Sequence, residues 1–453
     1  MRTSLIAVGI SAAISSSIAH ATNGYFTHAV GTHTKAQAGA GIAYPTQVID
    51  AANNPAAAAI TASHTEIGVA YFAPDRGYSA SSSFANGQGG AFTLTEEEVR
   101  SGKSGFVIPY FAHRWRPSEN SGLSLSFYGR GGMNTTYTGG SASFDPDGPG
   151  PAAAGTYGGV FGSGATGVNL NQAFLELAYG YDGGAWQLGI APIVAVQTFE
   201  ATGLSAFSGY TRTFAASGGQ NLPTSLTNNG TDFSYGFGLK LGLIAELTDW
   251  LNIGLRYQSE VNMTEFNKYS DLFANGGDFN IPASVQVGAS FKLSEQIRIN
   301  TDIEHTQFSD IDSVGNELAL VGGCPTAGQG GTNLENCAGG NQGFGFGWSD
   351  MTTYKLGGSW TPSGADRLTF RAGYSYGEQP VQSADVLINI LAPGVTEEHY
   401  TLGVEYRLPN ARSLNVSVMY APKNHVHGGN LFDPTQSITL DMDQYEIEFA
   451  YQF

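Results

Sequence analysis

The chain has 453 residues, a formal charge of −18 and 13% charged side chains. Its 62 glycines and 12% aromatic residues set it apart from an average cytosolic domain, and they suit many strands joined by turns. The acidic balance argues against nucleic acid as a partner of the chain as a whole.

The N-terminus has the pattern of a secretory signal peptide. Arg2 supplies positive charge, residues 5–18 are apolar or small, and the stretch from Ala19 to Ala21 forms a small-x-small cleavage site. We therefore expect residues 1–21 to be removed. No later segment contains the roughly 20 consecutive apolar residues of a membrane helix, which excludes a helical membrane protein.

Residues 22–63 differ from the rest of the chain because they show no period-2 alternation. They are rich in alanine and glycine, and Asn54, Pro55 and Ala56 interrupt the run. Short helices separated by glycine breaks are the expected structure. We predict that this segment forms a hatch, folded inside the lumen of a barrel made by residues 64–453.

From about residue 65 onward, apolar and polar residues alternate repeatedly, which indicates strands with two different faces. In the last strand, Tyr445, Ile447 and Phe449 alternate with Glu446 and Glu448. The polar faces carry too many charges to pack a soluble core, so the apolar faces are predicted to meet lipid. The same pattern recurs in residues 233–247, 251–260, 285–293, 297–304, 368–376, 400–408 and 414–420.

The connectors between these strands alternate in length. Short turns such as residues 182–184 alternate with long connectors at residues 77–104, 137–167, 199–230, 262–282, 309–349, 378–396 and 422–439. This layout predicts an all-β fold, a transmembrane antiparallel β-barrel of about 14 strands with its long loops outside the cell. We expect a monomer in the bacterial outer membrane, surrounded by lipid and lipopolysaccharide. C-terminal Phe453 is expected to contact the barrel-assembly machinery.

Cys324 and Cys337 are the two cysteines of the chain, and both lie in a glycine-rich polar stretch. A disulfide that closes one external loop fits an exported chain, and a metal pair is the alternative. His425 and His427 are the one close histidine pair, either on a metal or solvated in a loop. No metal or cofactor is predicted, and no serine-centred motif indicates an enzyme.

Several blocks, in one order along the chain, resemble the FadL/TodX family of outer-membrane transporters for hydrophobic compounds. Residues 23–26 and 36–43 are similar to the family's N-terminal hatch, which ends in the motif found here at residues 54–56. Residues 341–350, 371–376 and 391–400 resemble three later blocks. The resemblance spans the mature chain and implies the same hatch-closed barrel, with a kink in its third strand that opens the wall sideways.

The resemblance also suggests roles for two short segments. The third strand contains Gly129, Arg130, Gly131 and Gly132, which would form the kink. A bulge at the rim without a transport role is the alternative. The free end of the hatch would reach the ligand through its two aromatic residues, Tyr25 and Phe26.

Candidate binding residues lie in two long external loops and on two strands. The loops at 199–230 and 262–282 carry aromatic residues that would capture an apolar ligand, or that pack over the barrel mouth: Phe207, Tyr210, Phe214, Phe266, Tyr269 and Phe273. Lys355 and Arg371, on the polar faces of adjacent strands, are candidates to bind a carboxylate. A structural ladder against acidic residues is the alternative for both cations.

The predicted function is passive, hatch-gated transport of long-chain fatty acids or related hydrophobic compounds, with lateral exit. Uptake of aromatic hydrocarbons by the same barrel is left open by the sequence. Two other classes of function are the alternatives: a diffusion porin for small hydrophilic solutes, and an adhesin or structural barrel whose loops do the binding.

Overall fold

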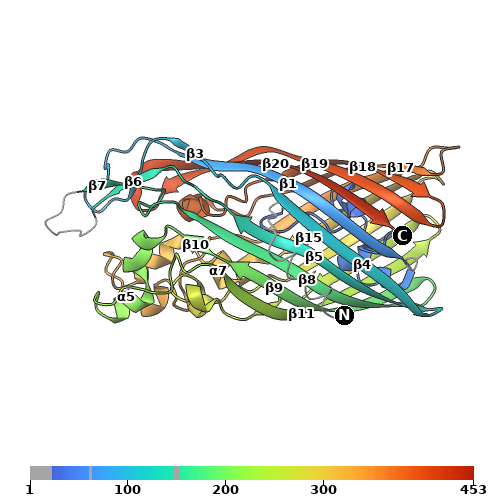
Figure 1. Cartoon of the computed structure of the whole chain (residues 1–453), viewed down its shortest axis with the longest axis horizontal. Coiled ribbons are helices and arrows are strands. Elements are labelled where there is room, and N and C mark those ends of the chain that lie inside the picture. The colour runs from blue at the N-terminus through green and yellow to red at the C-terminus, as the bar shows by residue number, and fades with distance from the viewer. Residues whose placement is uncertain (1–22, 61–63, 146–153) are drawn as a thin grey trace, which may run out of the picture.

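The computed structural model describes residues 23–60, 64–145 and 154–453, so the expected signal peptide lies outside the described residues. Fourteen long strands form a closed antiparallel β-barrel, as predicted, and the barrel closes where the first strand pairs with the last (Figure 1). In chain order these strands are β1 (Thr65–Ala80), β4 (Phe106–Ser118), β5 (Ser121–Asn134), β8 (Gly167–Asp182), β9 (Trp186–Phe199), β11 (Asp232–Thr248), β12 (Leu251–Gln258), β14 (Ser284–Lys292), β15 (Ile297–Thr306), β16 (Met351–Trp360), β17 (Leu368–Gly377), β18 (Glu398–Leu408), β19 (Arg412–Asn430) and β20 (Asp433–Gln452).

Within the barrel wall, apolar side chains face outward and polar side chains face inward, as the alternation predicts. On β15, Ile297 and Ile303 are 40% and 48% exposed on the outer face, whereas Asp302 and Glu304 on the inner face are buried. An apolar exterior and a polar interior belong to a barrel in lipid. Among the described residues, no helix is long and apolar enough to cross a membrane.

Short turns and long connectors alternate as predicted, with one correction. Residues 422–439 are not a loop, because β19 and β20 continue through them as a hairpin that turns at Leu431 and Phe432. Period-2 alternation persists there, but Ile438 and Leu440 now face inward and are fully buried. The polarity of the two faces has thus reversed beyond the membrane level, where the interior is a core of loops.

The long loops fold together at the end of the barrel opposite the C-terminus (Figure 1). They contain a small sheet of β2 (Thr93–Leu94), β6 (Ser141–Phe144) and β7 (Gly155–Gly158), and three short strands that extend the barrel sheet, β3 (Glu98–Arg100), β10 (Ala201–Thr202) and β13 (Asn262–Met263). The helices are α5 (Arg212–Ala216), α6 (Ala274–Gly277), α7 (Asp312–Gly315) and α8 (Val386–Asn389), with 3-10 turns η1 (Ser205–Tyr210), η2 (Asn267–Tyr269), η3 (Phe308–Asp310), η4 (Leu318–Gly323), η5 (Leu334–Asn336) and η6 (Ser383–Asp385).

The predicted disulfide is present, with an S–S distance of 2.02 Å between Cys324 and Cys337. Within residues 23–60, 64–145 and 154–453, no group of three or more His, Cys, Asp or Glu side chains is arranged to hold a metal ion. His425 and His427 both lie on β19, where the Nδ1 of His427 is 2.9 Å from the hydroxyl of Thr439.

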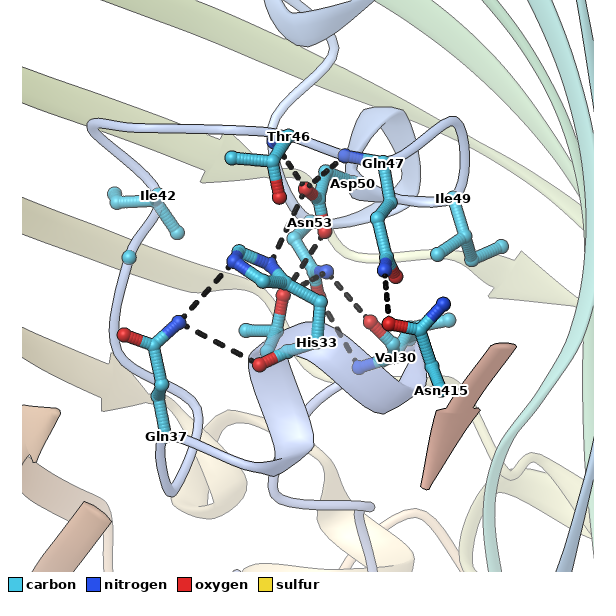
Figure 2. A network of polar contacts seen from close by, with 12 residues as sticks. Val30, His33, Gln37, Ile42, Thr46, Gln47, Ile49, Asp50, Asn53 and Asn415 are labelled. Atoms are coloured by element: carbon cyan, nitrogen blue, oxygen red, sulfur yellow. Dashed lines mark hydrogen bonds and ion pairs between the residues drawn. The ribbon is translucent and has the colours of Figure 1, made fainter. Parts of the chain in front are cut away.

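Residues 23–60 lie inside the lumen and form three one-turn helices, α2 (Thr32–Lys35), α3 (Asp50–Asn53) and α4 (Ala57–Ile60). Polar contacts hold this segment together (Figure 2). The carboxylate of Asp50 accepts hydrogen bonds from the amides of Thr46 and Gln47, at 2.8 and 2.9 Å, and from the hydroxyl of Thr34. Alanine and glycine side chains supply little apolar area, so such contacts fix the segment's shape.

A band of glycines on the inner wall makes room for this segment. On nine strands, a Cβ added to one glycine would lie under 3.0 Å from an atom of residues 36–59, so no larger residue fits without a shift: Gly122, Gly180, Gly189, Gly242, Gly254, Gly288, Gly357, Gly373 and Gly403. The first four are cross-strand neighbours on consecutive strands. Part of the unusual glycine content therefore allows backbone to pack against backbone.

This close packing generates a test with a matched control on one strand. Gly357→Ala would place a methyl group against Gln37, whereas Gly358→Ala, on the opposite face, meets the flexible tip of Ile299 at 3.2 Å. Overpacking costs roughly 1–3 kcal/mol. We therefore expect amides of residues 36–41 to exchange about tenfold or more faster in the Gly357 variant. Equal hydrogen exchange in the two variants would contradict the role of the glycine band.

Candidate functional site

The loops enclose a cavity of about 590 Å³ at the outer end of the barrel. Its lining includes six aromatic residues: Phe207, Tyr210 and Phe214 from the β9–β11 loop, Phe432 from the tip of the β19–β20 hairpin, Phe144 of the small sheet and Phe92 next to it. The rings of Tyr210 and Phe432 stack at 5.6 Å. This volume lies in the usual range of small-molecule sites, about 300–1,000 Å³. We call this space the outer cavity.

Half of the predicted loop aromatics line the outer cavity. Phe266, Tyr269 and Phe273 do not, because all three are buried against Phe199 with ring centroids 4.6–5.5 Å away. These three residues fit the alternative interpretation, in which the aromatic residues of a long loop pack over the barrel mouth and do not capture a ligand. Sequence reasoning missed Phe432, since residues 422–439 were expected to form a loop and their alternation was not used.

The disulfide loop supports one wall of the outer cavity. The amide of Ala338 donates to the carbonyl of Tyr210, and the amide of Arg212 donates to the carbonyl of Ala338, both at 2.9 Å. Arg212 also forms an ion pair with Glu335 at 3.0 Å. Cys324 and Cys337 therefore close the loop whose backbone holds Tyr210 in place.

Aromatic rings continue from the outer cavity toward the N-terminal segment. Phe207 contacts Phe344 at 5.9 Å, Phe346 contacts Trp348 at 6.3 Å, and Trp348 contacts Tyr25 at 5.7 Å between ring centroids. A small apolar cavity lies along this series, lined by Phe199, Phe273, Phe344, Phe346, Ile388 and Leu391. These rings provide a dry surface from the outer cavity to the tip of the N-terminal segment.

Strand β5 carries a bulge at the predicted glycines. Its register with β8 shifts between Gly129 and Gly131, which leaves Arg130 as the extra residue. Pairing of β5 with β4 ends at Tyr128, and pairing of β1 with β4 ends at Phe72. Beyond these residues β4 no longer bridges β1 and β5.

The tip of the N-terminal segment occupies the edge of β5 that β4 leaves. The amide of Gly132 donates to the carbonyl of Tyr25 at 2.9 Å, and the amide of Thr27 donates to the carbonyl of Arg130 at 3.2 Å. A Cβ at Gly131 would lie 2.6 Å from the same Tyr25 carbonyl oxygen, so the approach requires glycine. Residues 25–27 thus take the place of a neighbouring strand.

The motif at residues 54–56 anchors the other end of the segment. The side-chain amide of Asn54 donates to the carbonyls of Ile42 and Leu243, both at 3.2 Å. Its carbonyl oxygen accepts from the amide of Ala56 at 3.1 Å. One asparagine therefore ties the segment to itself and to β11, while Pro55 packs against Gly189.

The two predicted lumen cations have different surroundings. Lys355 bonds to Glu304 at 2.6 Å and to the carbonyl of His28 at 3.2 Å, and it lines a small polar cavity beside the N-terminal segment. Arg371 forms an ion pair with Glu405 and lines none of the cavities described here. Arg371 pairs in register with Ser359, which lies four residues after Lys355 on β16. At about 3.4 Å per residue, Ser359 is about 14 Å from Lys355 along the strand. The structure does not bring these two cations together.

These features define an outer-membrane barrel whose lumen holds its own N-terminal segment beneath an external cavity that aromatic side chains line in part. The chain belongs to the outer membrane protein transport protein family (OMPP1/FadL/TodX), whose model matches residues 12–430. It is a member of a family of outer-membrane transporters for hydrophobic compounds. Among curated proteins, none matches the sequence.

Solved structures support the same fold at low sequence identity. The toluene transporter TodX of P. putida has a TM-score of 0.60 and 15% identity, covering 94% of this chain and 98% of its own. A Pseudomonas aeruginosa FadL homologue has a TM-score of 0.60 and 16% identity, covering 95% and 98%. The Ralstonia pickettii toluene transporter TbuX has a TM-score of 0.57 and 15% identity, covering 94% and 98%.

The outer cavity generates a binding prediction. Phe432→Ala removes one face of the stack with Tyr210, and losing one aromatic wall costs on the order of 1.4 kcal/mol. We expect a fluorescent fatty acid to bind about tenfold more weakly to this variant in lipid nanodiscs. Phe84→Ala is the control, since Phe84 is 97% exposed and outside the cavity lining. Unchanged affinity in the Phe432 variant would exclude the outer cavity as the first binding site.

Asp385 generates a prediction about pH. It lies buried beneath Gly347, and burial raises the pKa of its carboxyl to about 6. Because the pKa in the unfolded chain is about 3.9, this carboxyl favours the packed loops most below pH about 4, and its contribution falls as pH rises through about 6. Asp385→Asn should remove that part of the pH dependence. The measurement is the hydrogen-exchange protection of residues 312–323 as a function of pH, corrected for intrinsic exchange rates. If protection depends on pH equally in the variant and the unmodified protein, Asp385 is not the group responsible.

Proposed function

We propose that this protein is a passive, hatch-gated channel for long-chain fatty acids or related hydrophobic compounds, which leave sideways through its wall. The observation that carries the proposal is the tip of the N-terminal segment, hydrogen-bonded along the free edge of β5 at the end of the aromatic series. In this proposal residues 22–63 are the hatch and residues 64–453 the barrel. The mature chain acts as a monomer, inserted by the barrel-assembly machinery through Phe453.

The energetics of an apolar substrate support a dry route. A fatty acid with about fourteen methylenes gains about 11 kcal/mol when they leave water, at about 0.8 kcal/mol each. A water-filled pore would forfeit most of this free energy. The aromatic side chains of the outer cavity and the series of rings from Phe207 to Tyr25 instead offer apolar contacts along the proposed route.

Opening breaks two backbone hydrogen bonds between residues 25–27 and β5, and each contributes about 0.5–1.5 kcal/mol net. It also breaks the ring contacts of Tyr25 and Phe26, which are both buried. An acyl chain that packs against the same surfaces replaces these apolar contacts, so the ligand itself can displace the tip. The space between β1 and β5 then leads to the outer leaflet, as expected for lateral exit.

Aromatic hydrocarbons are the second candidate substrates. Two of the similar structures, TodX and TbuX, are toluene transporters, and the cavities here carry enough aromatic surface for such ligands. An open porin is disfavoured, because the buried N-terminal segment contacts the wall on many strands.

A reversible cross-link tests the gate. In a background with Cys324 and Cys337 replaced by serine, Phe26→Cys with Gly131→Cys would tie the hatch tip to β5, where these residues form a bridge. Because a Cβ at Gly131 displaces the carbonyl of Tyr25, oleate uptake by the reduced variant is the reference for the oxidised one. Oxidation should abolish oleate uptake, and dithiothreitol should restore it. Phe111→Cys with Phe127→Cys is the control, because this pair joins β4 to β5 below the bulge. Full uptake by the oxidised hatch variant would contradict lateral gating by the tip.

A further inference from the structure

Three buried guanidinium groups lack a carboxylate partner in the described chain, and two of them line cavities. Eight lysines and arginines are buried in the described chain, and five form ion pairs with carboxylates: Lys35, Lys240, Arg256, Lys355 and Arg371. A sixth, Arg114, donates to the carbonyls of Ala58 and Ala59. Arg76 and Arg130 remain, with no carboxylate at ion-pair distance among the described residues. An uncompensated buried charge is costly, so these two need a reason.

Arg130 is the bulge residue of β5 and is 6% exposed. Its guanidinium lies 3.8 Å above the ring of Phe26, and its Nε and Nη2 have no acceptor in the described structure. It lines the polar cavity next to the N-terminal segment, a space of about 20 Å³ that has room for a water molecule. We call this space the inner cavity.

The charges around the inner cavity do not balance. Four cations line it, namely Lys240, Arg256, Lys355 and Arg130, and the only carboxylate in the lining as described is Glu304. Arg256 and Lys355 share Glu304, while Lys240 pairs with Glu176. Four cations therefore face two carboxylates, and Arg130 is the cation left without one.

Arg76, on β1, is 2% exposed and lines a second small cavity, on the far side of Tyr25. One Nη donates to the carbonyl of Asn134 on β5, across the interval that β4 does not bridge, and Nε has no acceptor in the described structure. The hydroxyl of Tyr25 is likewise without a partner there. We call this space the wall cavity.

We propose that Arg130 and Arg76 are two successive binding sites for the anionic head group of a carboxylate-bearing amphiphile. This inference rests on the proposed function and selects a fatty acid over a neutral hydrocarbon. A guanidinium binds a carboxylate through two parallel hydrogen bonds, and both arginines line cavities and carry N–H groups that have no acceptor in the described structure. Residues 25 and 26 separate the two sites, so displacing the hatch tip joins the cavities and lets the head group pass toward the wall.

The test compares oleate with methyl oleate, which share one acyl chain and differ in charge. Arg130→Gln and Arg76→Gln should each lower oleate uptake into proteoliposomes at least about tenfold, since a charged hydrogen bond typically contributes that much. Methyl oleate uptake should stay within about twofold of the unmodified protein, on the same assumption. Arg130→Lys and Arg76→Lys, which keep the charge, should retain most oleate uptake. Arg116→Gln is the control, because Arg116 is exposed near the end of β4 and lines none of the cavities described here.

Heat-modifiable migration on gels shows whether each variant has a folded barrel. Loss of both ligands in a folded glutamine variant would overturn the proposal, because it would indicate a structural role. Unchanged oleate uptake would overturn it as well. Failure of the unmodified protein to carry either ligand would instead refute the proposed function.

Discussion

Hydrocarbon offers no hydrogen-bond partners, so each backbone amide and carbonyl in the barrel wall has to be paired within the protein. The continuous ladder that closes between β1 and β20 meets this requirement around the circumference. The exception lies above Tyr128, where β5 loses β4. There the pairing comes from the N-terminal segment and from the guanidinium of Arg76, neither of which belongs to a barrel strand next to β5. This part of the wall is thus the part that is not completed by a neighbouring strand.

In the interior, too, backbone groups are paired within the protein. The N-terminal segment offers mostly backbone, alanine and a few polar side chains, and the wall meets it with glycines and charged groups. Lys240 donates to the carbonyl of Ala52 at 2.7 Å, and Asp302 accepts from the amides of Gly41 and Ile42. Each of these wall groups satisfies a backbone group of the segment. The lumen is therefore filled by hydrogen-bonded backbone, and apolar packing is reserved for the loops outside the membrane.

The sequence predicted the barrel well because lipid imposes one rule on every strand. Ile297, Ile303 and their neighbours had to face outward, and this alternation set the number of strands. Beyond the membrane the rule no longer applies. The inward faces of β19 and β20 become apolar there, which is why their extension looked like a loop and Phe432 was missed.

The site was harder to predict, because its chemistry depends on which charges remain unpaired. Lys355 and Arg371 look alike in sequence, yet Lys355 binds a carbonyl of the N-terminal segment, whereas Arg371 is paired with Glu405 and lines none of the cavities described here. Arg130 was noted for its flanking glycines, which indicated the bulge, but no local pattern indicates that its guanidinium has no carboxylate beside it. The absence of a carboxylate partner depends on residues from several strands, so it can be recognised only in the folded barrel.

The glycine band has a consequence for motion. Interlocked side chains resist sliding, since each must change rotamer before its neighbour can move. Where backbone rests on glycine, that kind of resistance is absent. On nine strands the wall therefore holds the segment by close backbone contact and by polar bonds such as those of Lys35 and Asp302, without interlocked side chains at the glycines.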